Sequence, residues 1–313
     1  MTITHYDLIG DIHGRAEKLT NLLQQLGYQP IDGVYQQAGH QAIFVGDFID
    51  RGTQEKQVIT LVRRMMDNGH ALAVMGNHEF NAICYHTRAE NGEYLRRHNP
   101  NHSQQHQAFL DEYPFEAEET QDVIAWFKTL PIFLELPQFR VIHACWDEQT
   151  LAQLKPHLDD RHCLKPAHYQ QASEKGHFFY QAIETLLKGP ELYLPEGTLF
   201  TDKDGTPRPK VRVKWWQADL HTYRAAAVVS EQSRMLLPDT PISVDEPLIC
   251  YPNDAPVIFF GHYWFTGTPQ LISQNAVCLD YSAARTGQLV AYRFAVDAQG
   301  LSNANFFASD KNL

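Results

Sequence analysis

The sequence predicts an α/β fold whose central strands run parallel and alternate with helices. In the first eighty residues, apolar runs at 6–9, 42–45 and 71–75 are typical of buried strands, and amphipathic helices are expected between them at 16–26 and 56–66. Each apolar run ends in a glycine that is followed by Asp or Asn. Strand, polar loop, helix and strand in this order is the pattern of a βαβ unit, which places its strands in parallel.

The first helix illustrates the pattern. Leucines recur between residues 16 and 26 at spacings of three and four residues, which lines one face of a helix with apolar side chains. Gly27 follows the last of these leucines and marks the end of the helix. The leucine spacing and the stop at Gly27 together predict an amphipathic helix at 16–26.

The regular cycle stops after the third strand. Residues 87–115 are rich in Asn, His, Glu and Gln, which indicates loops and short helices outside the sheet. A helix is expected at 122–130, where Pro131 ends it. Strands follow at 132–136 and 139–142, joined by a short turn.

The span 147–255 is predicted to be an insertion or cap rather than sheet core. It contains an expected helix at 181–188 and a polar turn at 202–205. Since there is neither a repeat of solenoid type nor a long linker, residues 1–313 are expected to form one domain with insertions at 87–115 and 147–255. Strands resume after the second insertion, at 257–260, 276–279 and 289–294, and a polar tail follows them.

The composition suits a globular protein that does not bind polyanions in general. With 43% hydrophobic and 12% aromatic residues, the chain can bury a full core. Its net charge of -11 argues against stable binding to nucleic acid or to a membrane surface. A protein of this charge that acts on phosphates must build a positive site locally, and metal ions are one way to do so.

The cysteines and the N-terminus bear on the compartment. The five cysteines are scattered and never form a Cys-x-x-Cys pair, which disfavours a disulfide framework and fits a reducing environment. The first residues lack the features of a signal peptide, and no apolar run is long enough to cross a bilayer. We therefore expect a cytoplasmic protein with no membrane partner.

Sixteen histidines is a high number for 313 residues. Several lie in polar stretches, and we expect these to be solvated loop residues. The informative histidines are those that follow predicted strands, beside Gly, Asp or Asn. The group in polar stretches comprises His98, His102, His106, His157, His162 and His168.

Five short segments share one design, in which an apolar strand ends abruptly in side chains that can bind metal. In a parallel sheet the carboxyl ends of the strands lie along one edge, where open α/β sheets bind ligands. Side chains far apart in the sequence can therefore meet there, namely Asp11, His13, Asp47, Asn77, His143 and His262. The segments are Gly10-Asp11-Ile12-His13-Gly14, Gly46-Asp47-Phe48-Ile49-Asp50-Arg51-Gly52, Gly76-Asn77-His78-Glu79, Val141-Ile142-His143-Ala144 and Phe260-Gly261-His262-Tyr263.

The ligand types favour a site with two metal ions. Carboxylate and imidazole together suit borderline ions such as Mn²⁺, Fe²⁺ or Zn²⁺, whereas a calcium site would be almost all oxygen. A carboxylate between two ions about 3.5 Å apart can bridge them and leave a shared water, whose lowered pKa makes it the natural nucleophile for in-line attack on phosphorus. Flanking glycines allow a phosphate to approach the backbone, and the helix N-termini that follow add positive dipole ends.

Each segment alone also has an ordinary structural explanation. Gly-Asp-x-His-Gly is typical of a strand-end turn, Asn-His of a helix cap, and one His in an apolar strand of a buried histidine with a hydrogen-bond partner. Five such segments in order, each after its own strand, favour the functional interpretation.

Taken together, the five segments resemble the calcineurin-like metallophosphoesterases. The form Gly-Asp-x-x-Asp-Arg-Gly at 46–52 points to the branch that contains the serine/threonine phosphoprotein phosphatases and the bacterial symmetrical diadenosine tetraphosphate hydrolases. The resemblance extends over residues 6–295, although the span between His143 and His262 matches the family poorly. It implies two packed mixed β-sheets flanked by helices (an αββα sandwich) with a helical or loop insertion.

The resemblance also implies two divalent metal ions, with Mn²⁺ expected first and Fe, Zn, Ni or Co as alternatives. By motif position, Asp47 would bridge the two ions. The first metal would be held by Asp11 and His13, and the second by Asn77, His143 and His262.

The same resemblance assigns the catalytic roles. His78 is similar to the general acid that protonates the leaving oxygen, with Asp50 orienting its imidazole. Arg51 would clamp the phosphate through its planar fork, and Asn77 would also contact the substrate. The alternative for Arg51 is a structural salt bridge with Asp50.

Two departures from the family pattern concern the late histidines. Ala144 and Cys145 follow the first of them, where the eukaryotic-type protein phosphatases carry two glycines. The second lies in Gly-His-Tyr-Trp, which is closer to the Gly-His-Trp pattern of the diadenosine tetraphosphate hydrolases. Arg212 and Lys214 are candidates for a second phosphate-binding residue, and the alternative is an edge strand with basic residues on its solvent face. Aromatic side chains that could stack on an adenine or aryl group, with core packing as the alternative, are Trp215, Trp216, Tyr263 and Trp264.

The leading functional hypothesis is a phosphatase with two metals that hydrolyses phosphomonoesters, including phosphoserine, phosphothreonine or phosphotyrosine in proteins. The alternative enzyme is a symmetrical dinucleoside polyphosphate hydrolase, which would cleave an anhydride with the same site. A metal-stabilised binding protein without catalysis is a third hypothesis, against which the presence of Asp50, Arg51 and His78 argues. A nuclease is disfavoured, because the acidic chain offers no basic stripe for a nucleic-acid backbone.

Overall fold

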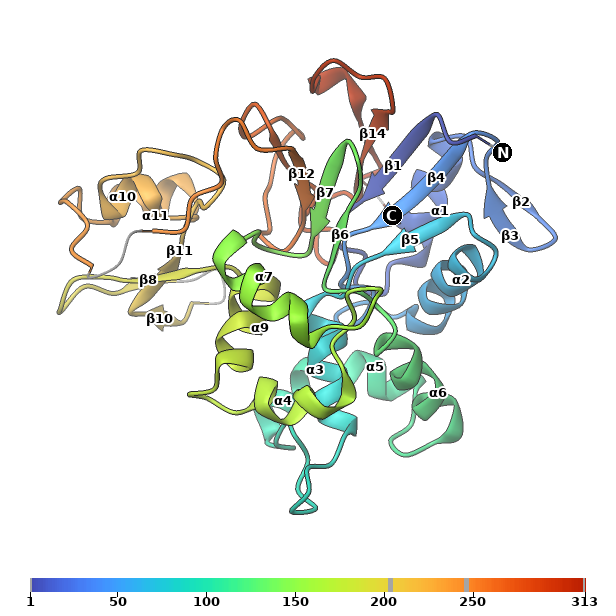
Figure 1. The fold of residues 1–313 in the computed structure, drawn as a ribbon, viewed down its shortest axis with the longest axis horizontal. Coiled ribbons are helices and arrows are strands. Elements are labelled where there is room, and N and C mark those ends of the chain that lie inside the picture. Colours follow the sequence, from blue (N-terminus) through green and yellow to red (C-terminus); the bar gives the residue numbers. More distant parts are fainter. Residues whose placement is uncertain (1, 202–204, 245–247, 312) are drawn as a thin grey trace.

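Two mixed β-sheets pack face to face at the centre of the protein, and helices cover their outer sides (Figure 1). The computed structural model describes residues 2–201, 205–244, 248–311 and 313. The predicted α/β class and the αββα arrangement implied by the resemblance are confirmed. In these described ranges, no helix has the length and apolar character needed to cross a bilayer.

The first sheet has the strand order β15-β14-β1-β4-β5. Its parallel part consists of β1 (His5–Ile9), β4 (His40–Phe44) and β5 (Ala71–Ala73), as the βαβ pattern predicts. On the other side of β1, β14 (Val290–Ala295) and then β15 (Phe306–Ala308) pair antiparallel. The three parallel strands therefore end at one edge of this sheet.

The second sheet has the strand order β13-β12-β7-β6. Here β12 (Val257–Phe260) lies parallel to both β7 (Phe139–Ile142) and β13 (Ala276–Cys278), while β6 (Phe133–Glu135) is antiparallel to β7. The long span between β7 and β12 thus connects two neighbouring strands.

Both faces of each sheet are buried, which explains why the strands are continuous apolar runs. Side chains alternate between the two faces along a strand. Leu8 and Phe259 lie in the layer between the sheets. Their neighbours Ile9 and Phe260 lie in the larger cluster that includes the helices.

Helices follow the parallel strands of the first sheet. They are α1 (Ala16–Gln25), α2 (Glu55–Asp67) and α3 (Asn77–His86), of which the first two lie close to the positions predicted at 16–26 and 56–66. The helix predicted at 122–130 instead occupies α6 (Glu118–Phe127). Its early start is favoured because acidic residues in the first turn suit the positive end of the helix dipole.

A hairpin after α1 and the strand β15 were not predicted from the sequence. The hairpin of β2 (Gln29–Ile31) and β3 (Val34–Gln36) turns at Asp32 and Gly33, both with positive φ, and Asp-Gly is the usual sequence signal for such a turn. The predicted polar tail is wrong at β15, because Phe306 packs against the ring of Tyr292 at a centroid distance of 5.0 Å.

The two insertions have different structures. The 87–115 segment folds into α4 (Pro100–Gln105) and α5 (Gln107–Glu112) with connecting loops, as expected. The second insertion begins with helices and continues into small two-stranded sheets, which form the yellow to orange part of Figure 1. These sheets share an apolar cluster of their own. Of the turn expected at 202–205, residues 202–204 lie outside the described part of the chain. The elements of the second insertion are α7 (Glu148–Leu154), α8 (Tyr169–Ser173), α9 (Phe178–Lys188), β8 (Glu191–Tyr193), β9 (Phe200–Thr201), β10 (Pro207–Arg208), β11 (Lys210–Arg212), α10 (Tyr223–Ala226) and α11 (Glu231–Leu236).

Candidate metal centre

The carboxyl ends of parallel strands from both sheets deliver polar side chains to one place. Asp11 follows β1 and Asp47 follows β4, while Asn77 opens α3 after β5. From the second sheet, His143 follows β7 and His262 follows β12. All five side chains are buried. The edge predicted from the strand-end motifs therefore exists, and both sheets contribute to it.

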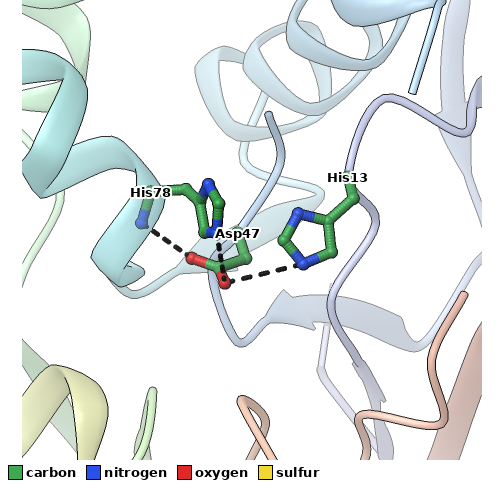
Figure 2. Close-up of side chains that lie close together, drawn as sticks. All are labelled: His13, Asp47 and His78. Atoms are coloured by element: carbon green, nitrogen blue, oxygen red, sulfur yellow. Dashed lines mark hydrogen bonds and ion pairs between the residues drawn. The ribbon is translucent and has the colours of Figure 1, made fainter. Parts of the chain in front are cut away.

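Asp47 lies at the centre of this group. Its Oδ2 atom is 3.4 Å from His143 Nε2, 3.7 Å from His13 Nε2 and 3.9 Å from His78 Nε2. Figure 2 shows Asp47 between the rings of His13 and His78. Asp47 belongs to two groups of potential ligand atoms lying within 4.8 Å of one another, one with His13 and His78 and the other with His143 and His262. A carboxylate common to two groups is what a bridging ligand requires.

Backbone carbonyls orient two of the imidazoles. His143 Nδ1 is 2.8 Å from the carbonyl oxygen of Val45, and His13 Nδ1 is 2.9 Å from that of Ile49. A neutral ring that donates from Nδ1 carries its lone pair on Nε2, which is the atom directed at Asp47. His143 Nε2 also lies 3.1 Å from Asn77 Oδ1, so the amide oxygen faces the same point.

Three atoms around Asp47 are suited to bind cations. Among the described residues, Asp11 Oδ1, His13 Nε2 and His262 Nε2 are buried and have no hydrogen-bond partner. A buried polar atom without a partner costs about 1–3 kcal/mol. Buried atoms of this kind beside Asp47 fit divalent ions, and the mixed oxygen and nitrogen donors suit Mn²⁺, Fe²⁺ or Zn²⁺ better than Ca²⁺.

The electrostatics of the site agree with this fit. Burial acts to raise the pKa of Asp47, but the neighbouring imidazoles, His143 foremost, hold it well below its usual range. Burial and the carboxylate of Asp280 raise the pKa of Asp11 well above its usual range, so a nearby cation would favour its ionised form. Burial lowers the pKa of His13 to about 3, which keeps its ring neutral and able to ligate a metal.

The backbone is strained at the ligands. His13, Asp47 and His262 have positive φ values of 51°, 52° and 73°, in a region that non-glycine residues rarely adopt. Such strain is concentrated at functional sites, where the surrounding structure enforces it. A Cβ atom on Gly261 would lie 1.9 Å from Asp11 Oδ1, so only glycine allows the backbone to pass this ligand.

Glu79 connects two of the ligand loops, a role that was not predicted. Its carboxylate accepts hydrogen bonds from the backbone N–H groups of Gly76 (2.9 Å), Asp47 (2.8 Å) and Phe48 (2.8 Å). Burial foremost, and then Asp47, raises the pKa of Glu79 to about 7. The available sequence signal was a glutamate at the third position of α3, where such residues cap helix N-termini.

His78 and Asp50 form the expected pair. Asp50 Oδ2 lies 2.6 Å from His78 Nδ1, so the Nε2 side of the ring faces Asp47. Asp47 and the hydrogen bond to Asp50 raise the pKa of His78, although burial acts in the opposite direction as the largest single influence. The other Asp50 oxygen, Oδ1, is 2.9 Å from Nδ1 of His106. The prediction that His106 is solvated is therefore wrong, because α4 and α5 fold back and bury it at 4% exposure.

Arg51 is exposed beside these residues, and its guanidinium carbon lies 4.4 Å from the ring centroid of Trp264. In the part of the chain that the structure describes, Arg51 makes no salt bridge with Asp50, which instead contacts two histidines. The core-packing alternative is correct for three of the four aromatic residues. Trp264 is only partly buried, whereas Trp215, Trp216 and Tyr263 belong to the main core.

The structure separates the two basic candidates in and after β11. Arg212 donates from Nε to the carbonyl oxygen of Lys188 at 2.7 Å. Burial is the largest influence that lowers the pKa of His262, and the charge of Arg212 is the second largest. Arg212 therefore lies close to the metal centre. Burial, and then Arg234 of α11, lowers the pKa of Lys214, while Glu231 of the same helix acts to raise it. Arg212, and not Lys214, is brought towards the site.

A fold of two mixed sheets whose strand ends present carboxylates and imidazoles around a shared aspartate defines a metal-binding α/β protein. Residues 4–263 match the family model described as "Calcineurin-like phosphoesterase", and the chain belongs to this family. Family membership implies divalent metal ions, and the Asp and His groups around Asp47 are where this chain could hold them.

Curated relatives match parts of the chain. The asymmetrical bis(5'-nucleosyl)-tetraphosphatase PrpE of Oceanobacillus iheyensis is 45% identical over 73 residues, which are 23% of this chain and 29% of that protein. A symmetrical bis(5'-nucleosyl)-tetraphosphatase of Shewanella sp. (strain W3-18-1) is 26% identical over 176 residues, which are 54% of this chain and 55% of that protein. The chain thus spans less than two thirds of either relative.

Solved structures share the fold over nearly the whole chain. A cold-active protein-tyrosine phosphatase of a psychrophilic Shewanella species superposes with a TM-score of 0.53 at 12% identity, covering 98% of this chain and 81% of that one. A protein serine/threonine phosphatase from Saccharomyces cerevisiae superposes with a TM-score of 0.51 at 15% identity, covering 98% and 79%. At these identities the likeness establishes the fold alone.

Proposed function

We propose that this chain is a phosphoester hydrolase that depends on two divalent metal ions and acts first on phosphomonoesters, including those of phosphoproteins. The observation that carries the proposal is the position of Asp47, which lies between His13 and His78 on one side and His143 and His262 on the other, with Asp50 bonded to His78. The two ions, when bound, would withdraw charge from the phosphoryl oxygens and activate water. The residues that would hold them are Asp11 and His13 for one ion, Asn77, His143 and His262 for the other, and Asp47 for both.

The protein side chains around the metals would complete the chemistry. His78 would protonate the leaving oxygen from Nε2, while Asp50 holds its Nδ1–H. Arg51 would bind the phosphate with its planar guanidinium, which Trp264 supports from one face. Arg212 is the better candidate for a second phosphate-binding cation, because it lies near His262.

A dinucleoside polyphosphate hydrolase is the second candidate. It is favoured by the curated relatives, which are named as bis(5'-nucleosyl)-tetraphosphatases. The partly buried Trp264 ring beside Arg51 also suits stacking against a nucleobase. Both functions would use the same metals and the same acid, so they differ in what the outer surface of the site accepts.

We also propose a cellular compartment and a domain organisation for this activity. The five cysteines are free, which fits a reducing compartment such as the cytoplasm. The chain would act as one domain. Its 147–255 segment connects the neighbouring strands β7 and β12 and would serve as a cap that determines which substrates are accepted. Phosphate esters, as small molecules, peptides or nucleotides, are the expected partners.

The test is a substrate screen with metal-reconstituted protein. The Mn²⁺-, Fe²⁺- and Zn²⁺-loaded forms are assayed against an aryl phosphate, a phosphopeptide panel and diadenosine tetraphosphate, with Asp47→Asn as the inactive control. We expect the highest kcat/KM for a phosphomonoester. A clear preference for the dinucleotide would reverse the order of the two candidates, and two bound ions without hydrolysis of any substrate would indicate a binding protein instead.

A further inference from the structure

Hydrogen bonds continue from the candidate acid His78 through Asp50 into the 87–115 insertion. Asp50 Oδ2 contacts His78 Nδ1 at 2.6 Å, and Asp50 Oδ1 contacts His106 Nδ1 at 2.9 Å. His106 Nε2 then lies 3.2 Å from His86 Nε2. All four side chains, which we call the Asp50 cluster, are buried. Two of them, His86 and His106, belong to none of the strand-end motifs.

The hydrogen-bond pattern determines where the ring protons lie. An ionised carboxylate only accepts, so His78 and His106 must each carry a proton on Nδ1. Nε2 of His106 then accepts from Nε2 of His86. In this arrangement every ring N–H of His106 and His86 has an acceptor. His86 Nδ1, which has no partner among the described residues, carries only a lone pair. Burial, aided by His106, lowers the pKa of His86 to about 3, in agreement with a neutral ring.

The second imidazole fixes Asp50 more firmly than His78 alone could. With one hydrogen bond, a carboxylate can rotate about its Cβ–Cγ bond and release its partner. With a donor on each oxygen, rotation breaks both bonds in a buried site, where an unsatisfied polar group costs about 1–3 kcal/mol. Burial acts to raise the pKa of Asp50, but its histidine neighbours, His106 first, hold it below its usual range.

His106 is itself held by packing. It lies at the junction of α4 and α5, and its backbone N–H bonds to the carbonyl of His102 at 3.1 Å. Its ring stacks on Phe109 at a centroid distance of 4.7 Å and packs near Tyr85 at 5.1 Å. The folded insertion therefore places the Nδ1–H of His106 opposite Asp50.

We propose that His106 is a positioning residue for the proton donor: it fixes the carboxylate of Asp50 and, through it, the imidazole of His78, while His86 sets the tautomer of His106. This inference rests on the proposed function, because it requires His78 to protonate the leaving group. It assigns the 87–115 insertion a part in the chemical step rather than in metal binding.

Paired substitutions at His106 test the proposal. His106→Phe removes the N–H donor but keeps a ring to stack on Phe109, whereas His106→Asn restores a donor near the position of Nδ1. With metal-loaded protein, we expect His106→Phe to lower kcat for phenyl phosphate by about tenfold, which is part of the roughly 10²–10⁴-fold that general acid catalysis contributes. The kcat for 4-nitrophenyl phosphate, whose leaving group needs little protonation, should fall by less than about threefold.

Three further readouts distinguish positioning from general damage. KM and the bound metal content should stay at wild-type values in His106→Phe, and His106→Asn should recover most of the lost rate with phenyl phosphate. His98→Phe, in the same insertion and stacked on Tyr85 at 3.9 Å, is the control and should leave both rates unchanged. Equal losses with the two substrates, or no recovery in His106→Asn, would overturn the proposal while the hydrolase function stands.

Ring-nitrogen NMR of Zn²⁺-loaded protein tests the geometry without turnover. We expect protons on Nδ1 of His78, Nδ1 of His106 and Nε2 of His86, and a shifted or broadened His78 signal in His106→Phe. An unchanged His78 signal would overturn the inference. If this pattern held but the wild-type protein hydrolysed neither ester, the proposed function would fail and the link between His106 and His78 would remain.

Discussion

Glu79 offers a test of what joins the two ligand loops that follow β4 and β5. Its carboxylate accepts three backbone N–H groups, from Gly76, Asp47 and Phe48, at 2.8–2.9 Å. Glu79 itself is fully buried. In Glu79→Ala these three donors lose their acceptor, and the backbone of Asp47 loses a tie that holds its strained conformation.

The magnitude follows from the contacts. Each buried donor left without a partner costs about 1–3 kcal/mol, so three of them cost roughly 3–9 kcal/mol. Removing Glu79 also removes the cost of burying its carboxylate, whose pKa is raised to about 7 mainly by burial. At pH 7 that relief offsets roughly 3 kcal/mol, since each pKa unit is worth about 1.4 kcal/mol. We expect a net loss of about 3 kcal/mol in the free energy of unfolding.

Denaturant unfolding of the metal-free protein at pH 7 measures this loss. Glu196→Ala removes an exposed glutamate and should change stability by less than about 0.5 kcal/mol. Glu79→Gln keeps one acceptor oxygen and should lie between wild type and Glu79→Ala. A loss below about 1 kcal/mol in Glu79→Ala would mean that these hydrogen bonds do not hold the loops together.

Three further predictions concern catalysis and pH. His78→Ala should keep its metals but lose about 10²–10⁴-fold in kcat with an alkyl phosphate and much less with an activated aryl phosphate; equal losses in steady-state assays would remove its assignment as the acid. Arg51→Lys keeps the charge but not the planar fork, so kcat/KM should fall about tenfold, and an unchanged value would exclude a clamp. Glu55 is buried and its pKa is raised to about 9, mainly by burial, so the stability that it contributes below pH 4.5 is lost as pH rises towards 9. In denaturant titrations, the free energy of unfolding of Glu55→Gln should therefore rise relative to wild type by about 1.4 kcal/mol per pH unit between pH 5 and 8. A stability difference that does not change with pH would contradict the raised pKa of Glu55.

The parts of the molecule that could be predicted from sequence are those with a local signal. Glycine followed by Asp or Asn after an apolar run marks a strand end, so β1, β4 and β5 and their ligands were predictable. The Asp32–Gly33 turn carries an equally local signal, because Asp-Gly favours the positive φ values that a tight hairpin turn needs. Phe306, in contrast, lies in a polar context, and only its packing on Tyr292 makes it part of a strand.

The remaining features depend on contacts between distant segments. His106 has the sequence surroundings of a solvated histidine, and it is buried because the insertion folds back onto Asp50. Arg212 and Lys214 are equivalent in sequence, but only Arg212 lies near His262. Such placements follow from tertiary packing, which no short motif encodes.

The central claim is that Asp47 bridges two divalent ions. A crystal of Mn²⁺-reconstituted protein measured at the manganese absorption edge tests it directly, because anomalous scattering locates the metal independently of the protein atoms. We predict two anomalous peaks about 3.5–4 Å apart, with one Asp47 oxygen between them, Asp11 and His13 on one ion, and Asn77, His143 and His262 on the other. A single peak, or two peaks that Asp47 does not join, would contradict the account.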